Sequence, residues 1–378
     1  MTLAIAVAGA AIGVAATVSP ASAAATASAV TPAATAPAAL AAVSCRSVND
    51  CMAVGSNTPT MPTQLAAEQW NGEKWTRLPM LKPAGVVNVG ANGVSCPGAR
   101  ECVAVGQAFP ANGPGPYALA GYWNGARWTT GRAAAPGTSS ELIAISCPTA
   151  ASCYAVGEYN PKGTVTTAAA LIEHWNGKSW AQQTAPMPHG APFGQLVAVS
   201  CATAKFCVAV GTTGAGELIE RWNGHAWIAA VPAAPAETNL WGVSCLTAAS
   251  CYAVGGTGSS TVVERWNGKA WSKSAAPVPA HSTSPFLQSV SCVSSARCLA
   301  VGDDLNTPPT VFADQWNGNA WKPVSMATSG PHLGDFEQVQ CLGATTCVAL
   351  GSASPFSAAW RSESAFWNGK TWKVIPTV

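Results

Sequence analysis

The cysteines of this chain fall into pairs of one spacing, C-x5-C, and these pairs recur along the sequence. On average, the first cysteines of successive pairs are about 49 residues apart. A fixed period of this length indicates a repeat architecture, which restricts the fold more than any other feature of the chain. The seven pairs are Cys45 and Cys51, Cys96 and Cys102, Cys147 and Cys153, Cys201 and Cys207, Cys245 and Cys251, Cys292 and Cys298, and Cys341 and Cys347.

A second marker, the motif W-N-G-x-x-W, repeats with the same period and the same count. Two independent markers that agree in period and number predict seven copies of one structural unit. The motif begins at Trp70, Trp123, Trp175, Trp222, Trp266, Trp316 and Trp367.

Each unit is expected to contain four β-strands. In the third unit, the short apolar segments bounded by turn residues are 142–146, 153–157, 169–175 and 179–183. Asn176-Gly177 predicts a two-residue type I′ hairpin that places Trp175 opposite Lys178, so that the two tryptophans of the motif meet only diagonally. No segment between residues 39 and 378 has a convincing helical period, because charges are sparse and proline recurs every few residues.

Seven such units in succession predict an all-β fold, a seven-bladed β-propeller with four antiparallel strands and one disulfide per blade. Because the chain starts on a first strand and ends on a fourth, blade 7 should pack on blade 1 without a shared strand. An open β-solenoid is the alternative, but its coils are usually shorter and it needs atypical end repeats. The blades are expected at about 39–85, 88–137, 140–188, 194–236, 238–280, 285–329 and 334–378.

Each C-x5-C pair is expected to form a disulfide that closes the hairpin between strands one and two. The chain-entropy model gives roughly 2–2.5 kcal/mol for so short a loop. A metal site is disfavoured, because this spacing is unusual for metal ligands and the five histidines are scattered. We therefore expect no metal and no cofactor. With all 14 cysteines paired, none remains as a nucleophile.

The N-terminus predicts export. Residues 3–18 form an apolar run shorter than the roughly 20 residues of a membrane span, and Ala21 and Ala23 fit signal-peptidase cleavage. We expect a signal peptide at 1–23 and a flexible Ala/Thr/Pro linker at 24–38. The basic n-region is missing, which suggests an upstream start codon; an uncleaved tail is the alternative. Since disulfides persist in oxidising compartments, a secreted or cell-wall-associated protein is expected.

Charge and composition exclude several classes of protein. A net charge of +2, with 10% charged residues, leaves no basic field to hold nucleic acid or an acidic membrane. An apolar content of 48% with 16 tryptophans can bury a core, which argues against disorder beyond the N-terminus. We expect a monomer with no integral membrane span in the mature chain.

Fourteen of the 16 tryptophans belong to the W-N-G-x-x-W pairs. They could be sugar platforms of a lectin, but a wall between blades is favoured, because large aromatics on outer strands fill the widening wedge. The residue two before the first tryptophan is acidic in five blades, and Gly121 and Ala365 replace it in the others. This distribution favours a hydrogen-bond partner over a catalytic carboxylate. The five acids are Glu68, Glu173, Glu220, Glu264 and Asp314.

The repeat predicts two unequal rims. The one–two and three–four turns share a nearly invariant rim, whereas the two–three turns and the crossings between blades form an irregular one. Function often lies in loops on a rigid scaffold, so the irregular rim and channel mouth are the predicted ligand site; neutral variation is the alternative. Trp241, which we expect in a crossing between blades, is the strongest candidate, because its equivalents hold Asn92, Ile143, Val197, Gln288 and Glu337. The candidate binding residues are Trp241, His189, His281, His332, Asp303, Asp304, Asp335 and Phe193, and no catalytic residue is predicted.

Two segments, EQWNGEKWTRLPM (68–80) and LIEHWNGKSWAQQTAPMP (171–188), resemble the end of a kelch repeat. The C-x5-C pair is not a kelch feature, and only Gly255-Gly256 comes near the kelch double glycine. The pattern SC-x5-CxAVG…ExWNGxxW is more similar to secreted propellers of actinobacteria, over about residues 40–378. This resemblance implies a seven-bladed fold and export, and it implies no activity, because the fold hosts enzymes, lectins and scaffolds.

Three functions remain open from the sequence. The first is a secreted, non-catalytic binding propeller for a glycan or protein at the cell envelope. The second is an extracellular hydrolase or lyase that uses one of the three candidate histidines with an aspartate at the channel mouth, although no motif ties two such groups together. The third is a structural cell-wall protein, supported only by the linker.

Overall fold

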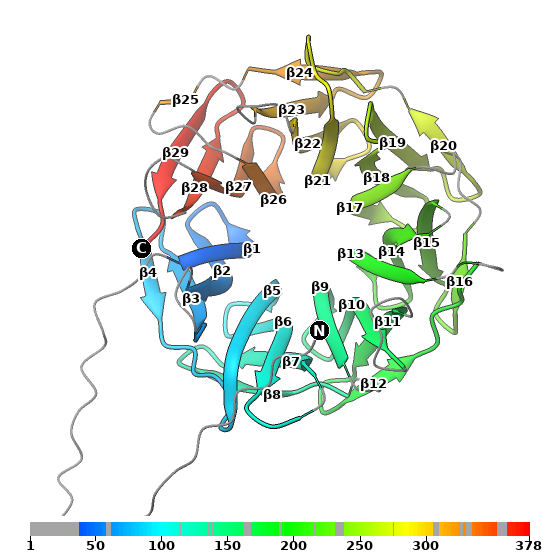
Figure 1. Ribbon diagram of the computed structural model, residues 1–378. Coiled ribbons are helices and arrows are strands. Elements are labelled where there is room, and N and C mark those ends of the chain that lie inside the picture. Colours follow the sequence, from blue (N-terminus) through cyan, green and yellow to red (C-terminus); the bar gives the residue numbers. More distant parts are fainter. Residues whose placement is uncertain are drawn as a thin grey trace, which may run out of the picture. The chain divides into compact units, whose positions relative to one another are not determined.

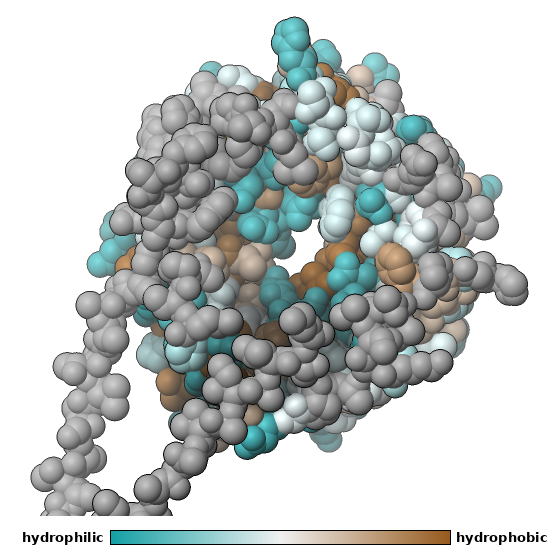
Figure 2. Space-filling view, viewed as in Figure 1, coloured by the Kyte–Doolittle hydropathy of each residue, from teal (hydrophilic) through white to brown (hydrophobic). Residues whose placement is uncertain are grey.

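The computed structural model describes residues 38–378 except 58–61, 114, 135–136, 138, 162–167, 189–190, 192, 215, 231–237, 275, 305–309, 326–327, 330–334 and 354–360. The predicted signal peptide lies outside the described residues, as does the predicted linker up to residue 37. The described chain forms strands and no helix, in seven sheets around a central opening (Figures 1 and 2). It accordingly contains no helix able to span a membrane. The prediction of an all-β, seven-bladed propeller is confirmed.

Within each blade, four strands follow one another as an antiparallel meander, with the first strand innermost (Figure 1). Blades 1 to 4 contain β1 (Ala38–Ser47), β2 (Asp50–Asn57), β3 (Leu65–Trp70) and β4 (Trp75–Leu78); β5 (Val86–Gly98), β6 (Glu101–Pro110), β7 (Tyr117–Trp123) and β8 (Trp128–Arg132); β9 (Ser139–Thr149), β10 (Ser152–Asn160), β11 (Ala169–Trp175) and β12 (Trp180–Gln183); β13 (Gly194–Thr203), β14 (Phe206–Thr213), β15 (Gly216–Trp222) and β16 (Trp227–Ala229).

Blade 7 has one strand more than predicted, because the two-residue β25 (Thr328–Ser329) pairs in parallel with β29. Its first strand, β26, and its last, β29, stay within their own sheet, so the ring closes without a shared strand, as predicted. Blades 5 to 7 contain β17 (Asn239–Thr247), β18 (Ser250–Gly256), β19 (Thr261–Trp266) and β20 (Trp271–Ser274); β21 (Pro285–Ser294), β22 (Arg297–Asp304), β23 (Thr310–Trp316) and β24 (Trp321–Val324); β26 (Asp335–Gly343), β27 (Thr346–Ala353), β28 (Arg361–Trp367) and β29 (Trp372–Pro376).

The prediction of one disulfide in each blade is confirmed for all seven C-x5-C pairs. The two cysteines of each pair lie on strands one and two of their blade, with Cα atoms 3.9–4.1 Å apart, and no cysteine is free. Seven disulfides indicate that the protein folds in an oxidising environment. The bonds join Cys45 to Cys51, Cys96 to Cys102, Cys147 to Cys153, Cys201 to Cys207, Cys245 to Cys251, Cys292 to Cys298 and Cys341 to Cys347.

The predicted type I′ register of the W-N-G-x-x-W hairpin is wrong. Trp175 pairs directly with Trp180 across a four-residue turn, and their rings are 5.7 Å apart. Only the glycine of the turn, Gly177, has a positive φ (90°), whereas type I′ requires positive φ at both central residues. Instead, Asn176 Oδ1 accepts hydrogen bonds from the backbone N–H groups two and three residues later, each at 3.0 Å. This side-chain acceptor stabilises the longer turn.

The paired tryptophans form a wall between blades, as favoured above. Twelve of the fourteen are at most 9% exposed, which leaves no open face for a sugar. Trp123 and Trp128 of blade 2, for example, pack in one cluster with Met52 and Val54 of blade 1. Across the closure, Trp70 and Trp75 pack with Val348 of blade 7.

In blades 1 to 6, a serine before the first cysteine links the innermost strand to the next blade. Ser244 Oγ, for example, accepts a hydrogen bond from Cys292 N at 3.0 Å. These bonds satisfy N–H groups on an exposed strand edge. Equivalent bonds join Cys96 to Ser44, Cys147 to Ser95, Cys201 to Ser146, Cys245 to Ser200 and Cys341 to Ser291, at 2.8–3.0 Å.

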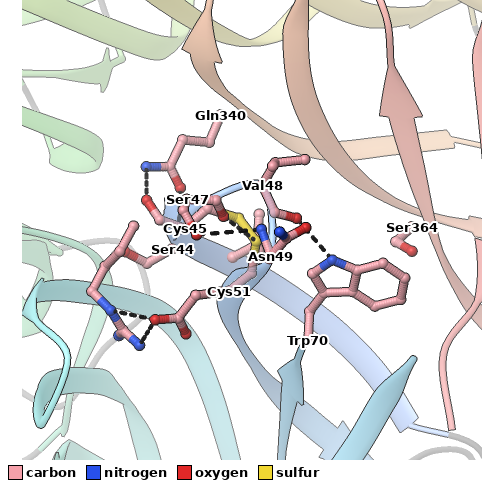
Figure 3. The surroundings of a disulfide bond; sticks show 12 residues. Ser44, Cys45, Ser47, Val48, Asn49, Cys51, Trp70, Gln340 and Ser364 are labelled. Carbon is pink, nitrogen blue, oxygen red and sulfur yellow. Dashed lines mark hydrogen bonds and ion pairs between the residues drawn. A yellow bond between two sulfur atoms is a disulfide. The ribbon is translucent and has the colours of Figure 1, made fainter. Parts of the chain in front are cut away.

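The seam between blades 7 and 1 uses glutamine where the other seams use serine. Gln340 accepts from Cys45 N at 2.6 Å and donates to Cys45 O at 3.1 Å (Figure 3). Gln338 accepts from Val43 N at 2.6 Å, and Ser364 accepts from the Trp75 indole at 2.9 Å. The longer side chains hold the ends of the ring together where the chain itself is not continuous.

Candidate functional site

Every innermost strand carries a β-bulge four residues before its first cysteine. In blade 5, Leu240 pairs with Gly255 and Gly242 pairs with Val254, so Trp241 between them has no partner in the ladder. A bulge redirects one side chain out of the regular alternation. The bulged residues of blades 1 to 7 are Ala41, Asn92, Ile143, Val197, Trp241, Gln288 and Glu337.

The glycine that ends the A-V-G or A-L-G motif of strand two makes room for each bulge. A Cβ placed on Gly255 would lie 1.9 Å from the carbonyl oxygen of Asn239, and the same contact would be 1.9–2.1 Å in the other six blades. No other amino acid fits at this close backbone approach. The glycine is therefore the residue type that permits the bulge.

All seven bulged residues line one cavity of about 450 Å³ in the central channel. The opening remains visible in the space-filling view (Figure 2). Trp241, Gln288 and Glu337 come from the adjacent blades 5, 6 and 7, and form one side of the cavity. Blades 1, 3 and 4 contribute alanine, isoleucine and valine at this position, and Asn92 of blade 2 donates its amide to Leu142 O at 3.0 Å. The cavity thus has an aromatic and polar side and an aliphatic side.

Acids surround the mouth of the channel next to this polar side. Glu337 faces the channel and keeps an exposed surface. Its partial burial in the channel and the nearby Asp335 charge both raise the pKa of its carboxyl group. Asp303 is 4% exposed, and burial together with repulsion from Asp335 and Glu337 raises its pKa to about 8. Removing these acids from water and placing them together disfavours their ionised forms.

The three predicted aspartates have structural partners. Asp303 accepts from Phe336 N of the next blade at 2.9 Å, and Asp304 accepts from Ser284 N at 3.1 Å. Asp335 accepts from the backbone N–H and hydroxyl of Ser352 at 2.7 and 2.8 Å. Asp303 and Asp304 are buried, so among the described acids on this side of the mouth Asp335 and Glu337 remain partly open to a ligand.

A second group of acids lies on the blade 3 side of the mouth. Glu141 and Glu158 are directly opposite each other on β9 and β10. Burial raises the pKa of both carboxyl groups, and the Glu158 charge raises that of Glu141 further. They line a small cavity of about 200 Å³ with Ser139, Ser140 and Asn160 among others.

Two of the other predicted residues lie apart from the cavity. Phe193 is 38% exposed directly before β13, and His281 lies in an exposed turn between β20 and β21 with a φ of 67°. His189 and His332 lie outside the described residues. Trp241, which we expected in a blade-to-blade crossing, lies within β17 and faces the channel.

Sequence reasoning missed Gln288 and Glu337 as candidates, although both occupy the same position as Trp241 relative to the cysteine. The signal that could have found them is the strand-two glycine, which marks the bulge in every blade. Among the described residues, no group of three His, Cys, Asp or Glu side chains has an arrangement that could hold a metal ion.

Comparison with known proteins supports the fold. No family model and no curated protein sequence matches the chain. YCF48 bound to a D1 peptide has 15% identity and a TM-score of 0.54, over 84% of this chain and 89% of that one. The GH74 xyloglucanase of Xanthomonas campestris has 12% identity and a TM-score of 0.60, over 90% of this chain but only 55% of that one. The WD40 repeats of RRP9 have 11% identity and a TM-score of 0.54, over 86% and 91%. At such identities the likeness shows a shared propeller fold alone.

Proposed function

We propose that the protein is an exported, non-catalytic binding propeller whose glycan or protein ligand enters the channel and contacts Trp241, Gln288 and Glu337. Export is supported by the seven disulfides and by the expected signal peptide at residues 1–23. The fold is one on which peptide binding has been seen, in YCF48.

The observation that carries the proposal is the variation at the bulges. Cysteines, the strand-two glycine and the Trp-Asn-Gly turn repeat in all seven blades, whereas the bulged position holds seven different residues. Packing between blades does not require this variation, because these side chains face the cavity and not a neighbouring blade wall. Seven different side chains around one cavity can recognise an asymmetric ligand.

The chemistry of the polar side narrows the ligand. An indole face stacks on a sugar ring or attracts a cation, and a neighbouring amide and carboxylate bond hydroxyl or amino groups. The carboxyl groups at the mouth offer hydrogen bonds and, where they are ionised, repel an anionic ligand. A neutral or amine-bearing glycan or peptide therefore fits best.

The test is a glycan and peptide array with the purified, oxidised protein, followed by calorimetric titration of any hit. We expect Trp241→Ala to weaken binding at least about tenfold, because it removes the largest contact surface in the cavity. Phe193→Ala is the matched control, since it removes an exposed aromatic outside the cavity. A ligand that is lost with Phe193→Ala but retained with Trp241→Ala would place binding on the irregular rim and refute the channel site.

A further inference from the structure

The C-x5-C loops and the W-N-G-x-x-W turns of all seven blades form one rim, which we call the disulfide rim. In blade 1, Cys51 pairs with Trp70 and Trp70 pairs with Trp75, which brings both turns to the same end of the sheet. The two turns are bonded to each other, because the Trp70 indole donates to Val48 O at 2.9 Å (Figure 3). The same bond recurs in blades 4, 5 and 6 at 3.0–3.2 Å. In these four blades the two turns therefore form one fixed surface.

Every blade places at least one exposed cationic side chain on this rim. Only two exposed carboxylates accompany them among the described residues, Glu73 and Glu101, and Arg46 is neutralised by its ion pair with Asp50. Eight cations against two carboxylates give the described part of the rim a net charge of +6. The cations, in order from blade 1 to blade 7, are Lys74, Arg100, Arg127, Lys178, Lys205, Lys269, Arg297 and Lys370.

None of these eight side chains forms an ion pair with a described residue. The ion pairs among described residues involve other arginines, Arg46 and Arg77. The Lys178, Lys269 and Lys370 residues stabilise their turns through backbone N–H groups, which donate to the turn asparagine at 2.9–3.0 Å. Their ammonium groups are thus left to solvent.

Carboxyl groups gather around the opposite mouth of the channel. The described charged side chains around its mouth include five carboxyl groups, from Glu141, Glu158, Asp303, Asp335 and Glu337. Burial keeps Asp303 protonated up to about pH 8, so the disulfide rim is the strongly charged end of the ring at neutral pH. A cationic surface at one end of a molecule orients it in the field of an anionic surface.

We propose that the disulfide rim docks on an anionic lipid surface and leaves the channel mouth facing away from it. Equivalent turns of a ring of blades lie at one level, so a flat surface can meet all seven blades at once, whereas a flexible polymer strand would meet only some. Among the described residues of the rim, Val48 is the one large hydrophobic side chain that is open to solvent, with 43% of its surface exposed. Attachment is therefore electrostatic and reversible, and it does not depend on the channel ligand.

The test uses vesicles of phosphatidylcholine with about 30 mol% phosphatidylglycerol, in buffer of about 0.1 M salt, and measures co-sedimentation of the purified oxidised protein. We expect binding to these vesicles, none to pure phosphatidylcholine, and release by about 1 M salt, where the screening length falls to about 3 Å. The triple variant Lys178→Gln, Lys269→Gln, Lys370→Gln should bind about a hundredfold more weakly.

The matched control removes the same number of exposed lysines from the outer strands, as Lys273→Gln, Lys322→Gln, Lys373→Gln. It should bind within about threefold of the parent protein. Circular dichroism and melting confirm that both variants are folded. Equal weakening by the two triple variants, or binding to pure phosphatidylcholine, would overturn the rim assignment. Capture by a soluble glycerol-phosphate polymer without vesicle binding would overturn the planar lipid surface.

Discussion

The buried acid before each W-N-G-x-x-W motif leads to a prediction about stability and pH. Glu173 accepts from Ala134 N at 3.1 Å, and Glu68 accepts from Val378 N at 3.1 Å. Both donors lie six residues after the second tryptophan of the preceding blade. For Glu220 of blade 4, that position is Pro186, which has no N–H group. Neither carboxyl oxygen of Glu220 has a hydrogen-bond partner among the described residues.

Burial without a donor raises the pKa of Glu220 from 4.5 to about 8. In the unfolded chain this group ionises near 4.5, whereas in the folded protein it keeps its proton until about pH 8. Its contribution to stability is therefore intact below pH 4.5 and is lost as the pH rises to about 8. At about 1.4 kcal/mol per pKa unit, the loss has an upper bound of about 5 kcal/mol.

Glu220→Gln should remove this dependence. The difference in free energy of unfolding between Glu220→Gln and the parent protein should increase by up to about 5 kcal/mol between pH 4.5 and 8. Above pH 8 the difference should stay level. Pro186→Ala should restore the N–H donor and give part of the same gain, because a hydrogen bond to the carboxylate favours the ionised form. Glu173→Gln is the comparison: the pKa of Glu173, which already has its donor, rises to about 7, so its gain should be smaller, up to about 3.5 kcal/mol.

Denaturant unfolding across this pH range measures all four proteins with their disulfides intact. Parallel pH profiles of the parent protein and Glu220→Gln would refute the reasoning, because they would mean that the Glu220 carboxyl ionises alike in both states. A gain with Glu173→Gln as large as that with Glu220→Gln would refute the role given to the missing donor.

Three further predictions concern the ring itself. Gly255→Ala should destabilise by more than about 3 kcal/mol in thermal melts, since its Cβ would clash with Asn239 O, whereas Gly131→Ala, with no neighbour within 4 Å, should have little effect. Ser244→Ala should cost about 1 kcal/mol by the same measurement, and Gln340→Ala about twice as much, because it loses two bonds at the closure. Reduction should lower the melting temperature, and mass spectrometry should show 14 added hydrogens under denaturing conditions.

The fold could be predicted from the sequence because both repeated motifs act locally. Two cysteines separated by five residues, such as Cys245 and Cys251, can bridge only neighbouring strands, and two tryptophans around Asn-Gly mark a hairpin in every unit. The predicted turn register is wrong for a local reason too: Asn176 uses its side chain as an acceptor, which the dipeptide rule does not include. The closure by Gln340 and Gln338 depends on residues nearly 300 positions apart, which no local pattern reveals.

The channel is only partly predictable, because a bulge shifts the alternation of side chains without leaving a periodic signal. Trp241 stands out in the sequence for being unlike its equivalents, but the pattern predicts a crossing for it and not the channel wall. The strand-two glycine is what connects these facts, since its missing Cβ admits the bulge and the bulge turns the residue inward. With that link, Gln288 and Glu337 are identified as channel residues because each lies four positions before the first cysteine of its blade.

Net charge is misleading for a related reason. A net charge of +2 argues against an acidic membrane as a partner, but it does not tell where the charges lie. In a ring of blades, the position of a residue in the repeat determines the rim on which its side chain lies. Eight exposed cations lie together on the disulfide rim, and acids gather around the opposite mouth. Because the two charged regions are at opposite ends of the channel, they should act independently: the lysine triple variant that weakens vesicle binding should leave the affinity of a Trp241-dependent ligand unchanged. If that affinity fell as well, the channel ligand and the lipid surface would share the disulfide rim, and the separation of the two sites would be refuted.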